Sequence, residues 1–488
     1  MMSEPITATA PASPVAGAPY RWRWAALFVI LAGEVMDLLD AMVTNIAAPE
    51  MRADLGGSEA VIQWLGAAYT LSMAVGLITG GRLGDIFGRR RMFLIGAAGF
   101  TVGSLLCAVA QSPEVLIGAR VIQGLFGSIM LPQGLGMIKE MFPPAEMGKA
   151  FGMFGPVMGL SAVGGPILAG WLVTADFWGT SWRMIFLINL PLGLAALLAG
   201  MRFLPESRSP QPPRLDLAGV ALASVGAFLV IYPLVQGREN DWPAWAFVML
   251  AASVLVFAVF GWFQSRRSRA GGDPLIVPSL FRKRAFTGGL FTGMVFFSGM
   301  AGFMLAFNLY CQLGLGYSPL KAGLAMVPWS GGMILGFGLA QGLQKFGRKL
   351  LQGGTLLMTL GVLGVVLTLN LAGMHVSPWQ LAPALIVSGI GMGLLMSPFF
   401  DIVLAGVEEH ETGSASGTLT AVQQLGNAFG VALLGTVFFD LLGDVPTAGS
   451  FDQAMKITLW VVAGMLLLTF VVAFLLPKQA RENAEAAH

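Results

Sequence analysis

The sequence predicts an all-α polytopic membrane protein, and three observations support this fold class. The 488 residues are 56% hydrophobic and 11% charged, whereas a soluble domain carries about 25% charged residues. Apolar runs of about 20 residues, the length that crosses about 30 Å of hydrocarbon, recur between Trp24 and Leu476. Weak internal repetition also relates the first part of the chain to the last. This composition argues against a soluble enzyme and against a nucleic-acid-binding protein.

We predict fourteen membrane-spanning helices, and the positions of the basic residues predict their orientation. Most of the 28 Lys and Arg residues fall in the tails and in alternate loops, and the positive-inside rule places those segments in the cytoplasm. An even number of spans then puts both termini in the cytoplasm, in a multi-pass protein of the cell (inner) membrane. The predicted spans cover residues 24–48, 60–81, 92–111, 114–137, 147–172, 183–204, 215–236, 243–264, 285–313, 319–341, 350–373, 379–405, 412–439 and 456–476.

Two short patterns occur twice at nearly the same offset and divide the chain. Phe87-Gly88-Arg89-Arg90 is echoed at 346–349, and the Glu-x-Gly-x-Ala-x-Gly pattern of 146–152 returns at 411–417. This order predicts two six-helix halves, with two further helices inserted between them. The predicted segments are a disordered cytoplasmic tail at 1–20, an N-terminal half at 21–204, an inserted two-helix hairpin at 205–264, a basic cytoplasmic linker at 265–284, a C-terminal half at 285–477 and a cytoplasmic tail at 478–488.

Five motifs carry a resemblance to a known family. They are the loop signature GxLxDxxGRR at 81–90, RxxQG at 120–124, GGPxxAG at 164–170, LDxxxxNxAxP at 39–49 and WRxIFxINxPxG at 182–193. With these motifs the chain resembles the fourteen-span drug:proton antiporter branch of the major facilitator superfamily over nearly its whole length, although Met42 stands where that branch usually has threonine. The resemblance implies a major facilitator fold, made of two six-helix halves plus two inserted helices, and transport rather than enzyme catalysis.

Three carboxylates in the first span carry the predicted chemistry. Glu34, Asp37 and Asp40 lie within one helix, and an ionised carboxylate in mid-bilayer costs about 2.5–3.5 kcal/mol. Glu34, Asp37 and Asn45 gather on one side of that helix, and Asp40 lies about 60° from Asp37. Burial and like-charge neighbours favour the protonated form of a carboxyl group, so this stripe is predicted to exchange protons for a cationic substrate. The alternative is that one or more of the three, Glu34 above all, pairs structurally with a polar neighbour.

Other polar residues inside the predicted spans have two possible roles each. Arg120 is the sole basic residue placed in the hydrocarbon, where it needs a partner. The resemblance assigns it to a proton relay with a carboxylate of the first span, and a purely structural ion pair is the alternative. Asp401 is predicted to be either a second coupling group or an interfacial acid. Asn308 and Gln312 are either donors to a cavity or partners in helix–helix hydrogen bonds.

The resemblance also assigns the moving parts. It implies a conformational latch on the cytoplasmic side, with an acid received by the helix that begins near Thr412, and the latch residues are Gly81, Asp85, Arg89 and Arg90. It implies an exporter hinge in the fifth span, for which tight helix packing is the alternative, and the hinge residues are Gly165, Pro166 and Gly170.

These observations predict a proton-coupled antiporter that exports hydrophobic, cationic drugs or toxic compounds by alternating access. The proton gradient drives this transport, without a cofactor or a metal. The alternative is a dedicated exporter of a single antibiotic or metabolite. A non-transporting receptor or membrane enzyme is disfavoured because neither an appended domain nor a catalytic constellation is visible. The expected partners are a small hydrophobic or cationic substrate, protons and membrane lipids, with no nucleic acid, and the expected state is a monomer.

Overall fold

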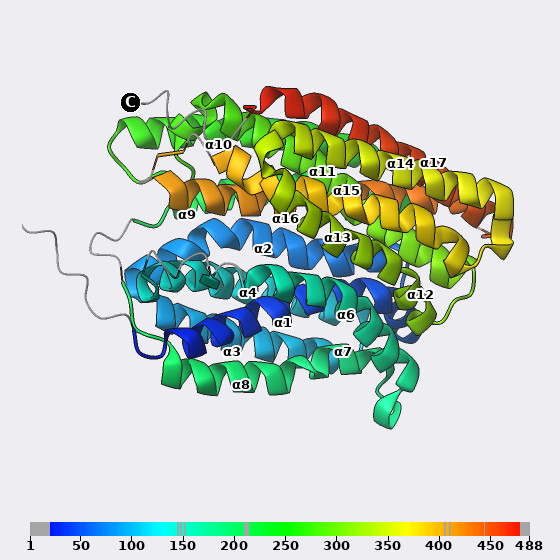
Figure 1. Ribbon diagram of the computed structural model, residues 1–488, viewed down its shortest axis with the longest axis horizontal. Helices are drawn as coiled ribbons and strands as arrows, with labels where there is room; N and C mark the ends of the chain where they lie inside the picture. Colours follow the sequence, from blue (N-terminus) through cyan, green and yellow to red (C-terminus); the bar gives the residue numbers. More distant parts are fainter. Residues whose placement is uncertain are drawn as a thin grey trace, which may run out of the picture.

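The chain folds into a long helical bundle (Figure 1). The computed structural model describes residues 20–143, 146, 149–150, 153–208, 214–404, 407–408, 411–443 and 445–478. Every regular element in these ranges is helical, which confirms the all-α prediction. The predicted tails at 1–20 and 478–488 fall almost wholly outside the described residues.

The helices follow one another in two groups of crossings with a hairpin between them. The first group contains α1 (Arg23–Leu55), α2 (Ala60–Phe87), α3 (Arg89–Ala108), α4 (Pro113–Met141), α6 (Phe154–Ala175), α7 (Met184–Leu187) and α8 (Asn189–Phe203). The hairpin contains α9 (Leu217–Gln236) and α10 (Ala244–Arg269). The second group contains α11 (Arg284–Leu309), α12 (Pro319–Ala325), α13 (Val327–Leu343), α14 (Arg348–Ala372), α15 (Pro378–Leu404), α16 (Thr412–Leu442) and α17 (Ala448–Val472).

Local sequence explains where several of these helices begin. Ser112 caps α4 by accepting a hydrogen bond from the amide of Val115, and proline occupies the first position of that helix, where no amide hydrogen is needed. Asp216 caps α9 in the same way. Gly88 and Gly347, the glycines of the repeated Phe-Gly-Arg pattern, have φ values of +102° and +49°, which favour glycine. The repeat therefore marks the same kind of helix-to-helix turn in both groups.

The two groups pack in the same way. In the first group α2 and α3 pack against α4, and α1 packs against α6. The corresponding helices of the second group repeat these pairs, because α13 and α14 pack against α15 and α11 packs against α16. The hairpin helix α9 lies against both α2 and α16, so it touches both groups (Figure 1).

The number of recognisable spans is smaller than the fourteen predicted. Among the described residues, twelve helices are long and apolar enough to cross a membrane, and a shorter apolar helix covers Gly164–Ala175. The helix α1 is not among the twelve, although its 33 residues are sufficient to cross, because the carboxylates of Glu34, Asp37 and Asp40 interrupt its apolar run. The described chain begins and ends at the same end of the bundle (Figure 1).

Replacing Gly80 with alanine is expected to lower the stability of the bundle. A Cβ atom at this position would lie 2.0 Å from the carbonyl oxygen of Ser128, so α2 and α4 must move apart at a cost of about 1–3 kcal/mol. We expect Gly80→Ala to lower the midpoint of thermal unfolding in detergent, measured as the loss of monodisperse elution after heating. Gly338→Ala is the control, because the exposed Gly338 has open space for a Cβ atom. Equal midpoints for the two variants would contradict this close approach.

Candidate functional site

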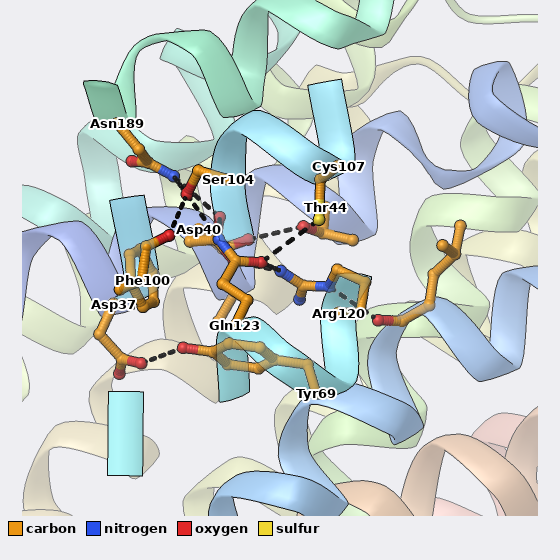
Figure 2. Close-up of polar contacts among 12 residues, drawn as sticks. Asp37, Asp40, Thr44, Tyr69, Phe100, Ser104, Cys107, Arg120, Gln123 and Asn189 are labelled. Carbon is orange, nitrogen blue, oxygen red and sulfur yellow. Dashed lines mark hydrogen bonds and ion pairs between the residues drawn. The ribbon is translucent and has the colours of Figure 1, made fainter. Parts of the chain in front are cut away.

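A buried ion pair joins α1 to α4. Arg120 donates from its Nη1 to Oδ2 of Asp40, and the two side chains are 1% and 0% exposed. The guanidinium also donates to Oε1 of Gln123 over 2.7 Å and, through Nε, to the carbonyl oxygen of Leu65 over 3.2 Å. The structure therefore brings Arg120 together with Asp40, one of the three first-span carboxylates that were candidate partners (Figure 2).

The second oxygen of Asp40 is enclosed by neutral donors (Figure 2). Oδ1 accepts a hydrogen bond of 2.8 Å from Nε2 of Gln123 and one of 2.9 Å from Nδ2 of Asn189 on α8. Both amides also reach Oγ of Ser104 on α3, over 2.9 Å and 3.2 Å. Donors from α4 and α8 thus satisfy this carboxylate, as a buried charge requires, and Ser104 of α3 holds the two amides.

The RxxQG motif has a geometrical reason. Arg120 and Gln123 are three residues apart and therefore share one face of α4, which is the face turned to Asp40. Gly124 leaves room for α2, since a Cβ atom there would lie 2.5 Å from the carbonyl oxygen of Tyr69. This close approach places the Tyr69 ring under the Arg120 guanidinium, 4.2 Å from its carbon atom, in a favourable cation–π contact.

The other two carboxylates of α1 have a different environment. Asp37 is 7% exposed and accepts a hydrogen bond from the Tyr69 hydroxyl (Figure 2). Glu34 is partly exposed. Within the described part of the chain no cation forms an ion pair with either group. An ionised carboxylate here is uncompensated, so a proton or a cationic group of a ligand can supply the missing positive charge.

A proline in α1 creates a contact between the two groups of helices. Pro49 has no amide hydrogen for the carbonyl of Asn45, four residues earlier. Instead, Nδ2 of Asn308 on α11 donates to that oxygen over 2.5 Å, and Nε2 of Gln312 donates to the carbonyl of Ile46 over 2.6 Å. The Asn45 side chain itself donates to Ala41 within α1. Of the two roles predicted for Asn308 and Gln312, the structure shows hydrogen bonding between helices.

The predicted hinge residues lie where α6 meets α12. A Cβ atom at Gly170 would lie 2.5 Å from Cα of Leu320, and one at Gly323 would lie 2.2 Å from the carbonyl oxygen of Pro166. Gly165 instead faces α1, where a Cβ atom would lie 3.3 Å from Sδ of Met42. Two of the three hinge residues therefore hold the two groups of helices in close contact, and the third packs within the first group.

The predicted latch residues have partners within the first group. Arg89 donates to Oδ1 of Asp85 over 2.9 Å and pairs with Glu140 on α4, and Arg90 donates to the carbonyl of Met201. In the described ranges Asp85 has no other ion-pair partner, and the side chain of Thr412 itself lies outside them. Gly81 has ordinary contact distances, with Cβ of Pro132 at 3.7 Å. A latch between the halves stays a prediction.

Asp401 is not brought to this site. It is exposed near the end of α15, far along the chain from α1, and no hydrogen bond or ion pair among the described residues joins it to the Asp40 network. Tyr69, Ser104 and Asn189 belong to the site but were not selected from the sequence. Asn189 could have been selected from the sequence, since it lies in the WRxIFxINxPxG motif. Tyr69 and Ser104 lie in mainly apolar helices and belong to none of the motifs.

The helical repeat, the apolar helices and the buried charges together define a multi-pass membrane transporter rather than an enzyme. The chain belongs to the Major Facilitator Superfamily, whose family model matches residues 30–431. Among solved structures, it is similar to a POT family transporter in complex with 5-aminolevulinic acid, with a TM-score of 0.66 over 94% of this chain and 96% of that one. Their sequence identity is 17%, so this likeness shows the fold alone.

Two curated relatives carry more specific descriptions. A probable actinorhodin transporter of Streptomyces coelicolor is 52% identical over 440 residues, which cover 90% of this chain and 76% of the relative. A tetracenomycin C resistance and export protein of Streptomyces glaucescens is 33% identical over 449 residues, which cover 89% and 79%. Drug resistance and efflux proteins of the fourteen-span type are thus relatives of this chain, as the motifs predicted.

Replacing Asn308 with leucine is expected to loosen the contact between the two groups of helices. The change removes the donor to the Asn45 carbonyl and leaves that buried oxygen without a partner, which costs about 1–3 kcal/mol. We expect a longer and broader distance distribution between spin labels at Ala53 and Lys321, which are exposed at this end of the bundle, measured by double electron–electron resonance.

Gln341→Leu is the matched control for this measurement. It removes the exposed side-chain amide of Gln341 on α13 and leaves the contact between α1 and α11 unchanged. Labelling is selective because Cys107 and Cys311 are both buried. An unchanged distribution in Asn308→Leu would show that this bond does not hold the two groups together.

Proposed function

We propose that this protein is a proton-coupled antiporter that exports one antibiotic or a narrow group of related metabolites. The observation that carries the proposal is the difference between carboxylates one helical turn apart on α1. Asp40 is paired with Arg120 and enclosed by amides, whereas Asp37 and Glu34 have no cationic partner in the described residues.

This difference supports a division of roles. Asp40 and Arg120 hold α1 against α4, and the uncompensated carboxyl groups of Asp37 and Glu34 take up and release protons. Because a proton and a polar or cationic group of the substrate compete for these carboxylates, binding of one favours release of the other. Tyr69 links Asp37 to the Asp40–Arg120 pair, because its hydroxyl donates to Asp37 and its ring lies against the Arg120 guanidinium.

Alternating access requires contacts between the halves that form and break. The bonds from Asn308 and Gln312 and the packing of Gly170 on Leu320 are candidates. We infer fourteen spans, the twelve recognised by length and hydropathy together with α1 and α6. With both termini in the cytoplasm, as the basic loops predict, these contacts close the outer end of the transporter. In the opposite state Asp85, which here is paired with Arg89, latches the cytoplasmic end.

The relatives favour the alternative of a dedicated exporter over the main prediction of a broad drug pump. The relative that is 52% identical is described by a single compound, actinorhodin, and the second by tetracenomycin C. A broad pump for lipophilic cations is the second candidate, because the uncompensated carboxylates of α1 suit a positively charged ligand. The cell membrane, a monomeric state and the absence of a cofactor remain parts of the proposal.

Asp37→Asn is expected to abolish substrate-induced proton release from acidified everted vesicles. Asparagine keeps the size and the hydrogen bond to Tyr69 but cannot exchange a proton. We expect at least a tenfold loss of proton release, which corresponds to about 1.4 kcal/mol, with unfolding temperature unchanged. Asp401→Asn is the control, because that exposed acid lies away from the site, and we expect it to keep most of the activity.

Asp40→Asn should behave differently from Asp37→Asn. It abolishes transport and also lowers thermal stability, since an unpaired Arg120 is left buried at a cost of about 3–5 kcal/mol. Full proton exchange by Asp37→Asn would overturn the division of roles, and full exchange by Asp40→Asn as well would overturn proton coupling through α1.

The same vesicles distinguish the two substrate classes. Ethidium represents the lipophilic cations, and actinorhodin and tetracenomycin C represent single antibiotics named for the relatives. Proton release with one antibiotic and none with ethidium would support a dedicated exporter. Release with ethidium and with several unrelated cations would favour the broad pump.

A further inference from the structure

A large apolar cavity lies beneath the inserted hairpin, between the hairpin and helices of both halves. It has a volume of about 610 Å³ and is lined by α2, α9, α10, α11, α16 and the linker. Sites for small molecules typically have roughly 300–1,000 Å³. Its walls are mainly aliphatic and aromatic side chains, among them Val75, Ile78, Phe257, Phe260, Val422 and Leu425. No residue of the Asp40 network contributes to this lining.

The cavity lies at the depth of one leaflet. Ile78 is nine residues from the end of α2, and Thr418 is six residues from the start of α16. At 1.5 Å per residue these two residues lie about 9–14 Å from the helix ends. The deepest lining residues, Ala74 and Leu425, are thirteen residues from the same ends, so the cavity extends about 20 Å, from one end of the bundle to about the middle of the membrane. These are the ends at which the described chain begins and ends (Figure 1). In the orientation proposed above, this is the cytoplasmic leaflet.

Polar contacts tie the hairpin and the linker to α2 near both ends of that helix, so the walls of the cavity are fixed in place. At one end Arg238 donates to Oε2 of Glu59 over 2.5 Å. At the other end Arg82 donates to the carbonyl oxygens of Arg214, Pro274 and Leu275. An empty apolar cavity forfeits dispersion contacts, and an apolar cavity does not hold ordered water well. The expected occupant is an apolar chain.

The edge of the cavity is basic. Arg266, Arg269 and Arg282 are exposed next to the lining residues Ser265 and Phe281, and in the described ranges none of the three arginines forms an ion pair. The linker 265–284 contains a single acid, Asp273. This charge disfavours a cationic occupant and complements an anionic headgroup.

The neighbouring cations are already engaged. Arg267 pairs with Asp216 over 3.4 Å, and Lys283 donates to Oε2 of Glu411 over 2.5 Å. Burial of Glu411 favours its neutral form, but hydrogen bonds from Lys283 and Ser279 hold the pKa of that carboxyl below its ordinary value. Lys283 therefore stays bound to the start of α16, and the exposed arginines left for a ligand are Arg266, Arg269 and Arg282, together with Arg284 at the start of α11. The Arg266 guanidinium lies 5.4 Å from the ring of Trp262, and tryptophan is enriched at the membrane interface.

We propose that this cavity is a binding site for an anionic phospholipid of the cytoplasmic leaflet. One acyl chain fills the apolar cavity, and the phosphate headgroup lies against Arg266, Arg269 and Arg282. The bound chain touches α2 of one half and α11 and α16 of the other. It therefore stabilises the arrangement of the halves described here, and its release accompanies their movement.

The proposal is tested by lipid retention on the intact protein. The protein is purified from membranes and incubated with equal amounts of phosphatidylglycerol and phosphatidylcholine, and the lipids that stay bound are counted by native mass spectrometry. We expect preferential retention of one phosphatidylglycerol. Arg266→Gln, Arg269→Gln and Arg282→Gln should each weaken it by about fivefold. Arg202→Gln, an exposed arginine of α8 outside the cavity, should not change it.

A second pair of variants tests the cavity itself. Ala223→Trp fills it from α9 and should abolish the retained lipid. Ala251→Trp, on the exposed face of α10, adds the same ring outside the cavity and should leave retention unchanged. Monodisperse elution of both variants shows that they are folded.

Two results would overturn the proposal. One is equal retention of the two lipids. The other is lipid retention that Ala223→Trp leaves unchanged, which would place the bound lipid outside the cavity. The assay does not depend on transport, so a negative result here leaves the antiport proposal intact, and failed proton exchange leaves the lipid site intact.

Discussion

The buried ion pair between Asp40 and Arg120 is the interaction on which the first half of the protein depends. Two charges in this position are costly unless every lone pair and proton has a partner. The structure supplies those partners from α2, α4 and α8, and Ser104 of α3 orients the two amides. Each of these helices is therefore held at a definite rotation about its axis. The same requirement leaves Asp37 and Glu34 outside the pair, where they are available for protons.

The two halves are joined where proline interrupts the hydrogen bonding of a helix and where glycines allow two helices to approach closely. Pro49 leaves the Asn45 carbonyl without its helical donor, and α11 of the other half supplies one. Close approach at Gly170 and Gly323 adds packing without a strong bond. The inserted hairpin and the linker are likewise joined to α2 by polar contacts near both ends of that helix, and the apolar cavity lies between the hairpin and its neighbours. Contacts of this kind can separate at a low cost in free energy, as alternating access requires.

Much of the fold was predictable because the relevant information is local. Apolar runs predicted a helical membrane protein, and the repeated Phe-Gly-Arg pattern marked equivalent turns at Gly88 and Gly347. The count of fourteen spans was less secure, since the carboxylates that give α1 its chemistry also weaken its hydropathy signal. Asp401 was weighed as an interfacial acid and is exposed in the structure. Tyr69 and Ser104 escaped notice because single polar residues in apolar helices are common.

The sequence by itself determined the class of protein, its family and the few ionisable residues that enter the membrane, because hydropathy and motifs are properties of short segments. The tertiary structure alone decided which carboxylate Arg120 neutralises, which amides enclose it and which groups remain uncompensated. It also decided that Asp85 pairs within its own half and that a cavity lies beneath the hairpin. These outcomes depend on the rotation and depth of helices that are distant in the chain, and packing across the whole bundle sets both.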